Sequence, residues 1–227
     1  MSSSSSRLSA RDLARVPVFP LPNVALFPGA SLPLHVFEPR YRQMTEDILA
    51  GDRLIVVARL CEGYEADYEG KPAFHPVCGI GRVVQDEARP DGRYDLVVQG
   101  LSRVRVTREL PTSRAYRVVS VELLPDQTPS DAYALLSWQR ELAGLWEKLR
   151  PYLPESVRGL LERAYEVPSA GARIDMLAAA VVADPDERQR FLEELDPSQR
   201  SWLLVEKLRN LLSALSAPDV RAQSRLN

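Results

Sequence analysis

Short blocks of residues, some mostly apolar and some alternating between apolar and polar, fill the first half of the chain, and both patterns are typical of β-strands. The expected strands cover residues 16–19, 24–26, 32–36, 53–60, 77–84 and 116–124, together with a hairpin over 88–110 that turns at Pro90-Asp91-Gly92. Five prolines between residues 16 and 38 exclude a helix there. At least six short strands with tight links predict an antiparallel sheet or a small barrel.

One helix interrupts these strands. Tyr41, Met44 and Ile48 have the spacing i, i+3 and i+7, which places them on one helical face. Pro39 suits the first turn of this helix, and Gly51 suits its end.

The second half of the chain has a helical period throughout. The composition changes at residues 125–129 (PDQTP), and helices are expected at 130–150, 155–165, 170–183, 185–195 and 197–215, with Ser130 as the first cap. The sequence therefore predicts an α+β chain with a β-rich lobe at 16–125 and an α-helical lobe at 126–216. Residues 1–15 and 217–227 are polar, and we expect them to form a disordered and a flexible tail.

Charge and composition narrow the function classes. The chain has 29 basic and 31 acidic residues, and residues 1–125 alone have 16 basic and 15 acidic ones. A dedicated nucleic-acid binder usually has a basic excess, so nucleic acid is an unlikely partner. No apolar run approaches the roughly 20 residues that span a bilayer, and no secretory signal opens the chain. We expect a cytoplasmic protein without a membrane partner.

Motifs for catalysis, nucleotides and metals are missing from the sequence. There is no G-x-x-x-x-G-K-[ST] or G-x-G-x-x-G loop and no G-x-S-x-G elbow. The four soft ligands Cys61, Cys78, His35 and His75 lack the paired spacing of a zinc site. We therefore expect no catalytic residue, cofactor or metal. A small hydrolase that uses His75 or Cys78 is kept as an alternative to the two binding functions considered below.

Arginines and tryptophans in this sequence favour structural roles over nucleic-acid contacts. Arg103 and Arg105 lie on one strand face, where pairing with acids such as Asp95 is favoured over an anion or RNA site. The tryptophans recur at helical spacing among leucines, which indicates core packing rather than a stacking platform. They are Trp138, Trp146 and Trp202.

Three stretches of the chain resemble the N-terminal, substrate-binding domain of Lon proteases. The first is PVFPLPNVALFPGASLPLHVFEPRYR at residues 17–42, which resembles the opening signature of that domain. The second is GIGRVVQDEARPDGRYDLVVQGLSRVRV at 79–106, and the third is MLAAAVVADPDERQRFLEELDPSQRSWLLVEKL at 176–208. With the spacing between them, the resemblance covers residues 16–212.

This resemblance implies a fold and a role. It implies a PUA-like pseudo-barrel followed by a helical bundle, in a stand-alone bacterial Lon-domain protein without the ATPase and protease modules. It further implies a non-enzymatic, ATP-independent module that binds unfolded or damaged polypeptides as an adaptor or holdase, with a separate protease or ATPase as a further partner. An RNA-binding PUA-like protein is the alternative, and a homodimer through apolar helix faces is left open.

A receptor for unfolded chains needs exposed apolar groups and a free strand edge. We predict a polypeptide contact surface formed by Pro22, Val24, Phe27, Phe37 and Tyr41, with the edge supplied by the strands near residues 16–34. Phe37 and Tyr41 are more typical of core residues. The junction of the two lobes is a second candidate.

Overall fold

The computed structural model describes residues 8–216 and divides the chain into two compact units, residues 1–125 and 126–227. The first unit is built on six strands: β1 (Val16–Leu21), β2 (Ser31–Val36), β3 (Leu54–Arg59), β4 (Val77–Ala88), β5 (Tyr94–Leu110) and β6 (Arg117–Leu124). It also contains helices α1 (Ala10–Ala14) and α2 (Pro39–Leu49) and the short 3-10 turn η1 (Tyr64–Asp67). The β-rich first unit and the α+β class are as predicted.

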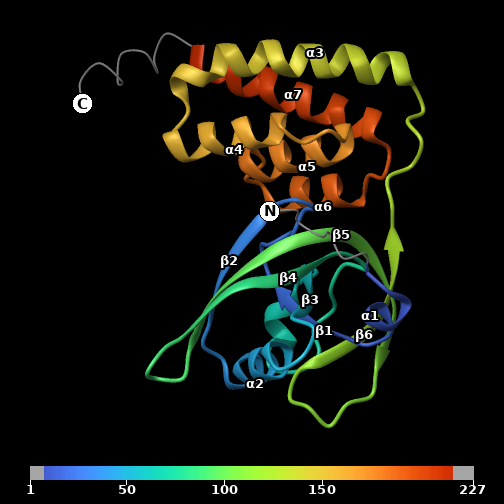
Figure 1. Ribbon diagram of the computed structural model, residues 1–227, viewed down its shortest axis with the longest axis vertical. Coiled ribbons are helices and arrows are strands. Elements are labelled where there is room, and N and C mark those ends of the chain that lie inside the picture. Colours follow the sequence, from blue (N-terminus) through green and yellow to red (C-terminus); the bar gives the residue numbers. More distant parts are fainter. Residues whose placement is uncertain (1–7, 217–227) are drawn as a thin grey trace. The chain divides into compact units, whose positions relative to one another are not determined.

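Five of the strands close into a ring. The sheet order is β2-β5-β4-β3-β1-β6, and β5 also pairs with β6, so β5, β4, β3, β1 and β6 form a small barrel (Figure 1). β1 and β3 are parallel, whereas the other pairs are antiparallel. A register shift between Ile80 and Gly81 marks a bulge in β4, as its glycines predict. β2 pairs with β5 alone and is the edge strand of the described sheet.

The expected strand at residues 24–26 is wrong, and glycines explain why. This segment crosses the sheet instead of joining it, because β4 and β5 offer glycine surfaces to its backbone. A Cβ placed on Gly79 would lie 2.0 Å from the Leu26 carbonyl oxygen, and one on Gly100 would lie 2.0 Å from that of Phe27. The next turn is tied to β5, because the Gly29 N–H donates to the Gly100 carbonyl at 3.0 Å.

Residues 8–15, expected to be disordered, contain helix α1. Ser9 and Asp12 form a reciprocal capping box at its start, in which the Ser9 N–H donates to Asp12 Oδ2 at 2.7 Å. Leu8 and Leu13 pack against the barrel core. The local cap and two apolar contacts together order a segment whose composition alone indicates disorder. Residues 1–7 and 217–227, the remainder of the predicted tails, lie outside the described residues.

Two apolar clusters stabilise the first unit. Strand β3 lies between them and contributes to both, since both of its faces are buried. Val56 belongs to the cluster that also holds Val18, Ile80 and Val104. Its neighbours Ile55 and Val57 point the other way, into the cluster where Met44 and Ile48 of α2 pack. The predicted apolar face of α2 is therefore confirmed.

The second unit is helical, as predicted. It consists of α3 (Ala132–Leu149), the 3-10 turn η2 (Arg150–Tyr152), α4 (Glu155–Tyr165), α5 (Ala170–Val181), α6 (Pro185–Glu193) and α7 (Pro197–Ser216). α3 and α4 pack against α7 and α5 respectively, and α5 also contacts α6 and α7 (Figure 1). Within residues 8–216, no helix is both long and apolar enough to cross a membrane.

A helix cap and a cluster of hydrogen bonds around Asp196 connect the helices of this second unit. Asp131, not Ser130, caps α3 by accepting from the Ala134 N–H at 2.8 Å. The Ser130 N–H instead donates to Asp196 at 3.0 Å, and Ser198 adds N–H and O–H donors at 2.7 and 2.6 Å. Burial raises the pKa of the Asp196 carboxyl, but these hydrogen bonds outweigh burial and lower the pKa to about 2.

Candidate functional site

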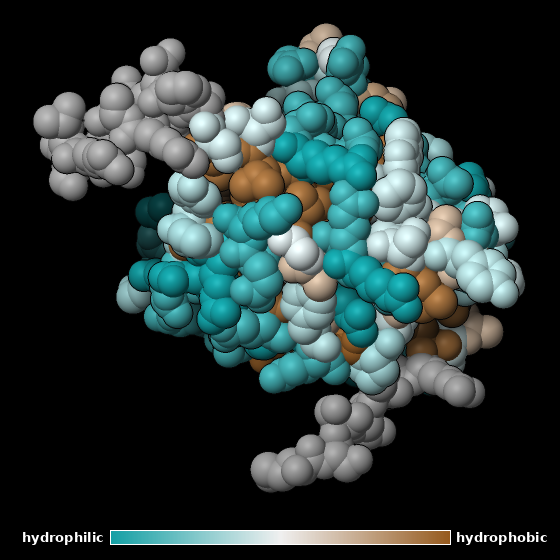
Figure 2. Space-filling model, turned by 90° about the horizontal axis from the view of Figure 1, so that it is seen from above, coloured by the Kyte–Doolittle hydropathy of each residue, from teal (hydrophilic) through white to brown (hydrophobic). Residues whose placement is uncertain are grey.

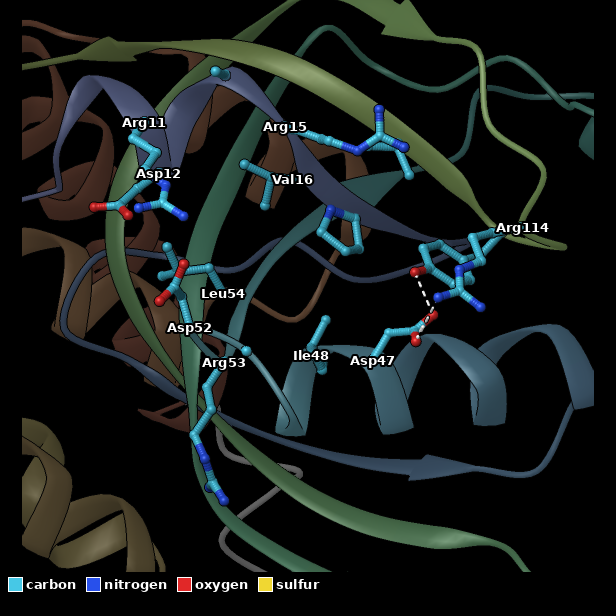
Figure 3. Close-up of a pocket in the computed structure, with 15 residues that line it drawn as sticks. Arg11, Asp12, Arg15, Val16, Asp47, Ile48, Asp52, Arg53, Leu54 and Arg114 are labelled. Atoms are coloured by element: carbon cyan, nitrogen blue, oxygen red, sulfur yellow. Dashed lines mark hydrogen bonds and ion pairs between the residues drawn. The ribbon is translucent and has the colours of Figure 1, made fainter.

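An open hollow of about 620 Å³ lies in the first unit, where α1, the end of α2 and the starts of β3 and β6 meet (Figure 3). Its lining includes the apolar side chains of Val16, Ile48, Leu54 and Val118. All four are core residues with at most 6% of their surface exposed, so this floor is rigid. We call this hollow the α1 groove.

Charged groups form the rim of the α1 groove. The cations are Arg11, Arg15, Arg53 and Arg114, and the anions are Asp12, Asp47 and Asp52. Arg114 pairs with Asp47 at 3.1 Å, whereas Arg53 pairs with Asp86 at 2.8 Å and extends away from the floor (Figure 3). Exposed Arg11 and Arg15 have no ion pair within residues 8–216.

Tyr116 joins the rim to the floor. Its hydroxyl donates to Asp47 Oδ2 at 2.7 Å. Burial, followed by this hydrogen bond, raises the pKa of Tyr116 to about 12. The hydroxyl is therefore a protonated donor at neutral pH, and the Arg114–Asp47–Tyr116 cluster fixes one wall of the groove.

The lining of the α1 groove suits binding. It contains no serine, threonine, cysteine, histidine or lysine side chain. A nucleophile paired with a base, the arrangement that covalent catalysis uses, is therefore not formed by these residues. An apolar floor under a rim of both charge signs fits an extended polypeptide, with an apolar side chain inside and polar groups at the rim.

None of the five residues predicted as a polypeptide contact surface lines the α1 groove. Phe27 and Tyr41 are 0% and 5% exposed. Phe27 lies in the segment that crosses the glycines of β4 and β5, and the Tyr41 ring packs at a tilt against Phe19, with ring centroids 4.4 Å apart. This burial corrects the expectation that Phe27 is accessible, and it agrees with the core role that the sequence favours for Tyr41. Pro22 and Val24 are half-buried.

Phe37 is the exposed member of the predicted set. It is 59% exposed just after β2, where its ring stacks with His35 at 6.2 Å. The expectation that Phe37 is a core residue is therefore wrong, because the buried face of β2 ends at Val36. A binding role for Phe37, Pro22 and Val24 stays a prediction.

The free strand edge also differs from the prediction. β1, at the start of the predicted region, is paired on both sides with β3 and β6. The free edge belongs to β2, and Pro33 lies in the middle of it without an N–H. Proline in an edge strand opposes the pairing of a further strand.

The soft ligands considered in the sequence have ordinary local contacts. The Cys78 thiol is buried and donates to the His75 carbonyl at 3.1 Å. His35 Nδ1 lies 2.6 Å from Asp95 Oδ1. Among residues 8–216, no group of three or more histidine, cysteine, aspartate or glutamate side chains is arranged to hold a metal ion.

The arginines and tryptophans partly follow their predicted roles. Arg105 pairs across strands with Glu122 at 3.5 Å, and Arg103 is buried. The prediction that these arginines pair with Asp95 is wrong, because the Asp95 carboxylate pairs with His35 and Arg89. Trp146 is a core residue, Trp138 is half-buried, and Trp202 is 44% exposed, which corrects its assignment to the core.

Sequence reasoning missed the α1 groove itself. Arg11 and Arg15 lie in the stretch expected to be disordered. The pattern Ser9-x-x-Asp12 is a capping-box signal that could have indicated the helix. The opposite wall comes from residues about one hundred positions away, for which the sequence offers no signal.

Comparison with known proteins decides the family. The family described as the ATP-dependent protease La (LON) substrate-binding domain matches residues 15–210. The chain belongs to this family. Solved structures agree in fold: the N-terminal domain of Mycobacterium avium complex Lon protease has a TM-score of 0.66 at 16% identity. It covers 86% of this chain and 98% of that one.

A Lon N-terminal domain protein from Xanthomonas campestris has a TM-score of 0.57 at 23% identity, covering 85% of this chain and 98% of that one. Among full-length relatives, Lon protease 2 of Myxococcus xanthus is 29% identical over 202 residues. Lon protease of Anaeromyxobacter dehalogenans is 30% identical over 198 residues. These alignments cover 88% and 86% of this chain but 24% and 23% of the relatives, so the chain spans about a quarter of their length.

Proposed function

We propose that this Lon substrate-binding domain binds polypeptides in non-native conformations and holds them, as a holdase or as an adaptor for a separate protease or ATPase. The match of the substrate-binding family over residues 15–210 carries this proposal. The matched region is the substrate-binding part of Lon, which supports a binding role without hydrolysis of its own. Location in the bacterial cytoplasm stays a prediction.

Unfolded chains differ from folded ones by their exposed apolar side chains, and the surface of this chain offers matching contacts. The α1 groove has an apolar floor, and Phe37 adds an exposed ring. The second unit exposes Tyr133, Leu136 and Trp202 by 88%, 55% and 44%. On the face shown in Figure 2, hydrophobic groups form separate patches bordered by hydrophilic ones. Several small apolar contacts suit loose, sequence-tolerant binding better than one specific pocket would.

Fluorescence anisotropy of a labelled, permanently unfolded protein tests the proposal directly. The folded counterpart and a single-stranded RNA are titrated in parallel, at low and at moderate salt. We expect saturable binding of the unfolded probe alone, with little loss at moderate salt, because apolar contacts are not screened. Binding of RNA alone that falls steeply with salt would refute the proposal.

Two alanines of α1 provide a matched pair of variants for the groove. Ala14 lines the α1 groove and Ala10 does not, and both are exposed. Ala14→Trp fills the groove and should weaken binding of the unfolded probe about tenfold, a loss of ~1.4 kcal/mol. Ala10→Trp, with the same change of size on the same helix, should leave binding unchanged. If the two variants bound the unfolded probe with equal affinity, the α1 groove would not be part of the contact surface.

A further inference from the structure

A second hollow of about 100 Å³ lies in the first unit, beside the α1 groove and more enclosed than it. Arg114 and Tyr116 line both hollows, so the two share a wall. One buried water needs roughly 10–15 Å³ of such space, which leaves room here for a group of several heavy atoms. We call this hollow the Tyr41 pocket, and its polar lining includes Arg40, Tyr41, Lys71, Glu109 and Arg117.

Tyr41 contributes a hydroxyl that has no hydrogen-bond partner among residues 8–216. Its ring is fixed in the core at 5% exposure, where it packs against Phe19 and under the Arg40 guanidinium, 4.8 Å from the ring centroid. Side-chain atoms of the described chain that are both unpaired and closed off from solvent belong to other residues, so the Tyr41 oxygen keeps accessible surface at the pocket it lines. Burial raises the pKa of Tyr41 to about 12, so the hydroxyl is protonated at neutral pH. Native proteins seldom leave such a donor unpaired, which indicates an acceptor in the pocket.

The lining of the Tyr41 pocket is strongly basic. Among the described residues that line it, Glu109 is the only acid, against the four cations Arg40, Lys71, Arg114 and Arg117. Arg40 is compensated from outside the lining by Glu38, at 3.0 Å. Arg114 is compensated in the same way by Asp47, at 3.1 Å (Figure 3). The charge balance of the pocket therefore depends on the other two cations.

Lys71 and Arg117 share the single carboxylate of Glu109, at 3.2 and 2.8 Å, so one positive charge is left over. The charge of Arg117 reaches the Tyr41 hydroxyl, since it lowers the pKa of that group against the larger effect of burial. Arg117 is also held in place, because its Nη1 donates to the Pro72 carbonyl at 2.6 Å. A fixed cation and a fixed hydroxyl lose little freedom when an anion binds between them.

The surroundings of the pocket favour an anion with a single charge. Glu38 and Asp47 stand behind the lining cations. Asp67 accepts from the Lys71 backbone N–H at 3.0 Å and adds a further negative charge nearby. A phosphate dianion would meet more repulsion from these acids than a carboxylate does. Buried Pro20 gives the pocket an apolar wall as well, which suits a carboxylate carried on one or two methylene groups.

We propose that the Tyr41 pocket binds the side-chain carboxylate of an aspartate or glutamate in a polypeptide held by the α1 groove. The proposal rests on the polypeptide-binding function inferred above and adds a preference for acidic residues to it. The carboxylate accepts from the Tyr41 hydroxyl and pairs with Lys71 and Arg117, while its methylene groups lie against Pro20.

Nuclear magnetic resonance of the nitrogen-15-labelled chain reads this contact through the backbone amides of Gly70 and Ala115, which line the pocket. The α-amide of N-acetyl-glutamate should move both signals saturably. The α-amide of N-acetyl-glutamine has the same shape without the charge, and it should bind about tenfold more weakly. N-acetyl-alaninate, with its carboxylate at the chain end, and inorganic phosphate should also bind more weakly than the glutamate probe. Tighter binding of either would overturn the assignment to an acidic side chain.

Two matched pairs of variants test the named donors. Tyr41→Phe removes the hydroxyl alone and should weaken the glutamate probe about three- to tenfold. Tyr94→Phe is its control, because Tyr94 packs against the same core cluster but does not line the pocket. Lys71→Gln should weaken the probe about two- to fivefold, whereas Lys148→Gln, at an exposed lysine of the second unit, should leave it unchanged.

The outcomes separate this inference from the proposed function. If the Gly70 and Ala115 signals stay fixed with the glutamate probe while the unfolded protein binds by anisotropy, water alone fills the pocket. That result would overturn this inference and leave the proposed function standing. Binding of the glutamate probe that Tyr41→Phe and Tyr94→Phe weaken equally would likewise overturn it. Absence of any binding by the unfolded protein overturns both.

Discussion

Arg200 offers the sharpest test of what holds the helical unit together. Its side chain is fully buried; Nη2 donates to Asp126 Oδ1 at 2.8 Å and Nη1 to the Glu194 carbonyl at 2.9 Å. Its Nε lies 3.3 Å from Asp175 Oδ1, whose side chain is 2% exposed. Arg200→Ala removes the guanidinium that pairs with Asp126 and with buried Asp175, while the desolvation of Asp175 persists. We expect a loss of about 3–5 kcal/mol in the free energy of unfolding.

A double variant separates the charge pair from simple packing. Arg200→Met with Asp175→Leu replaces the two most buried charges by apolar groups of similar size. Buried ion pairs replaced in this way are often neutral or more stable, so the double variant should unfold within about 1–2 kcal/mol of the original chain. The difference between the single and double variants measures the penalty for leaving Asp175 without its arginine.

Urea unfolding followed by tryptophan emission is the suitable assay, because all three tryptophans lie in the second unit. Arg209→Ala serves as control, since this exposed arginine pairs with Glu141 and Glu206 at the surface and its loss should hardly move the midpoint. A loss below about 1 kcal/mol for Arg200→Ala would refute the reasoning. A double variant as unstable as the single one would show that the loss of stability comes from altered packing and not from the unpaired charge.

Three further predictions address the core, the surface and pH. Gly79→Ala should destabilise the first unit by about 2 kcal/mol or more, because the added Cβ would meet the Leu26 backbone carbonyl. Gly144→Ala, whose Cβ would have no atom within 4 Å, should instead stabilise α3 by about 0.5–1 kcal/mol. Calorimetry measures both changes. Phe27→Ala should cost about 3–5 kcal/mol, while Phe37→Ser should leave the melting temperature unchanged and lower affinity for the unfolded probe in anisotropy. Because the folded-state pKa of Asp196 is about 2 and the ordinary pKa of an aspartate is 3.8, the stabilisation from this carboxylate is present above pH 4 and lost as pH falls through 2. Over that window the original chain should lose about 2 kcal/mol more than Asp196→Asn in acid unfolding; parallel curves would contradict the shift.

Local patterns were sufficient for most elements of this fold. The β-branched, mostly apolar run at residues 53–60 and the spacing of Tyr41, Met44 and Ile48 predicted β3 and α2 within a few residues. Both signals are short-range, since each is carried by residues that are near neighbours along the chain. Ring closure is different: it depends on the pairing of β5 with β6 and of β1 with β3, contacts between distant segments that no local pattern encodes.

The candidate site was harder to predict than the fold. Phe27 and Phe37 are both aromatic residues in the same proline-rich stretch, yet the first is buried and the second exposed. The difference arises at Gly79 and Gly100, far along the chain, whose bare backbone accepts the segment that contains Phe27. The α1 groove is likewise assembled from α1, α2 and the starts of β3 and β6, and exists only after the barrel has closed.

Closure of the barrel also limits how the first unit can capture a polypeptide. Each of the five ring strands pairs with at least two others over part of its length, so fewer of its N–H and C=O groups are left for an added strand. The exception, β2, carries Pro33 at the centre of its free edge and so lacks one of the donors that an added strand requires. Strand addition, a common way to bind extended chains, is therefore the weaker route in this fold. The proposed binding of polypeptides therefore relies on side chains, at the floor of the α1 groove and at Phe37.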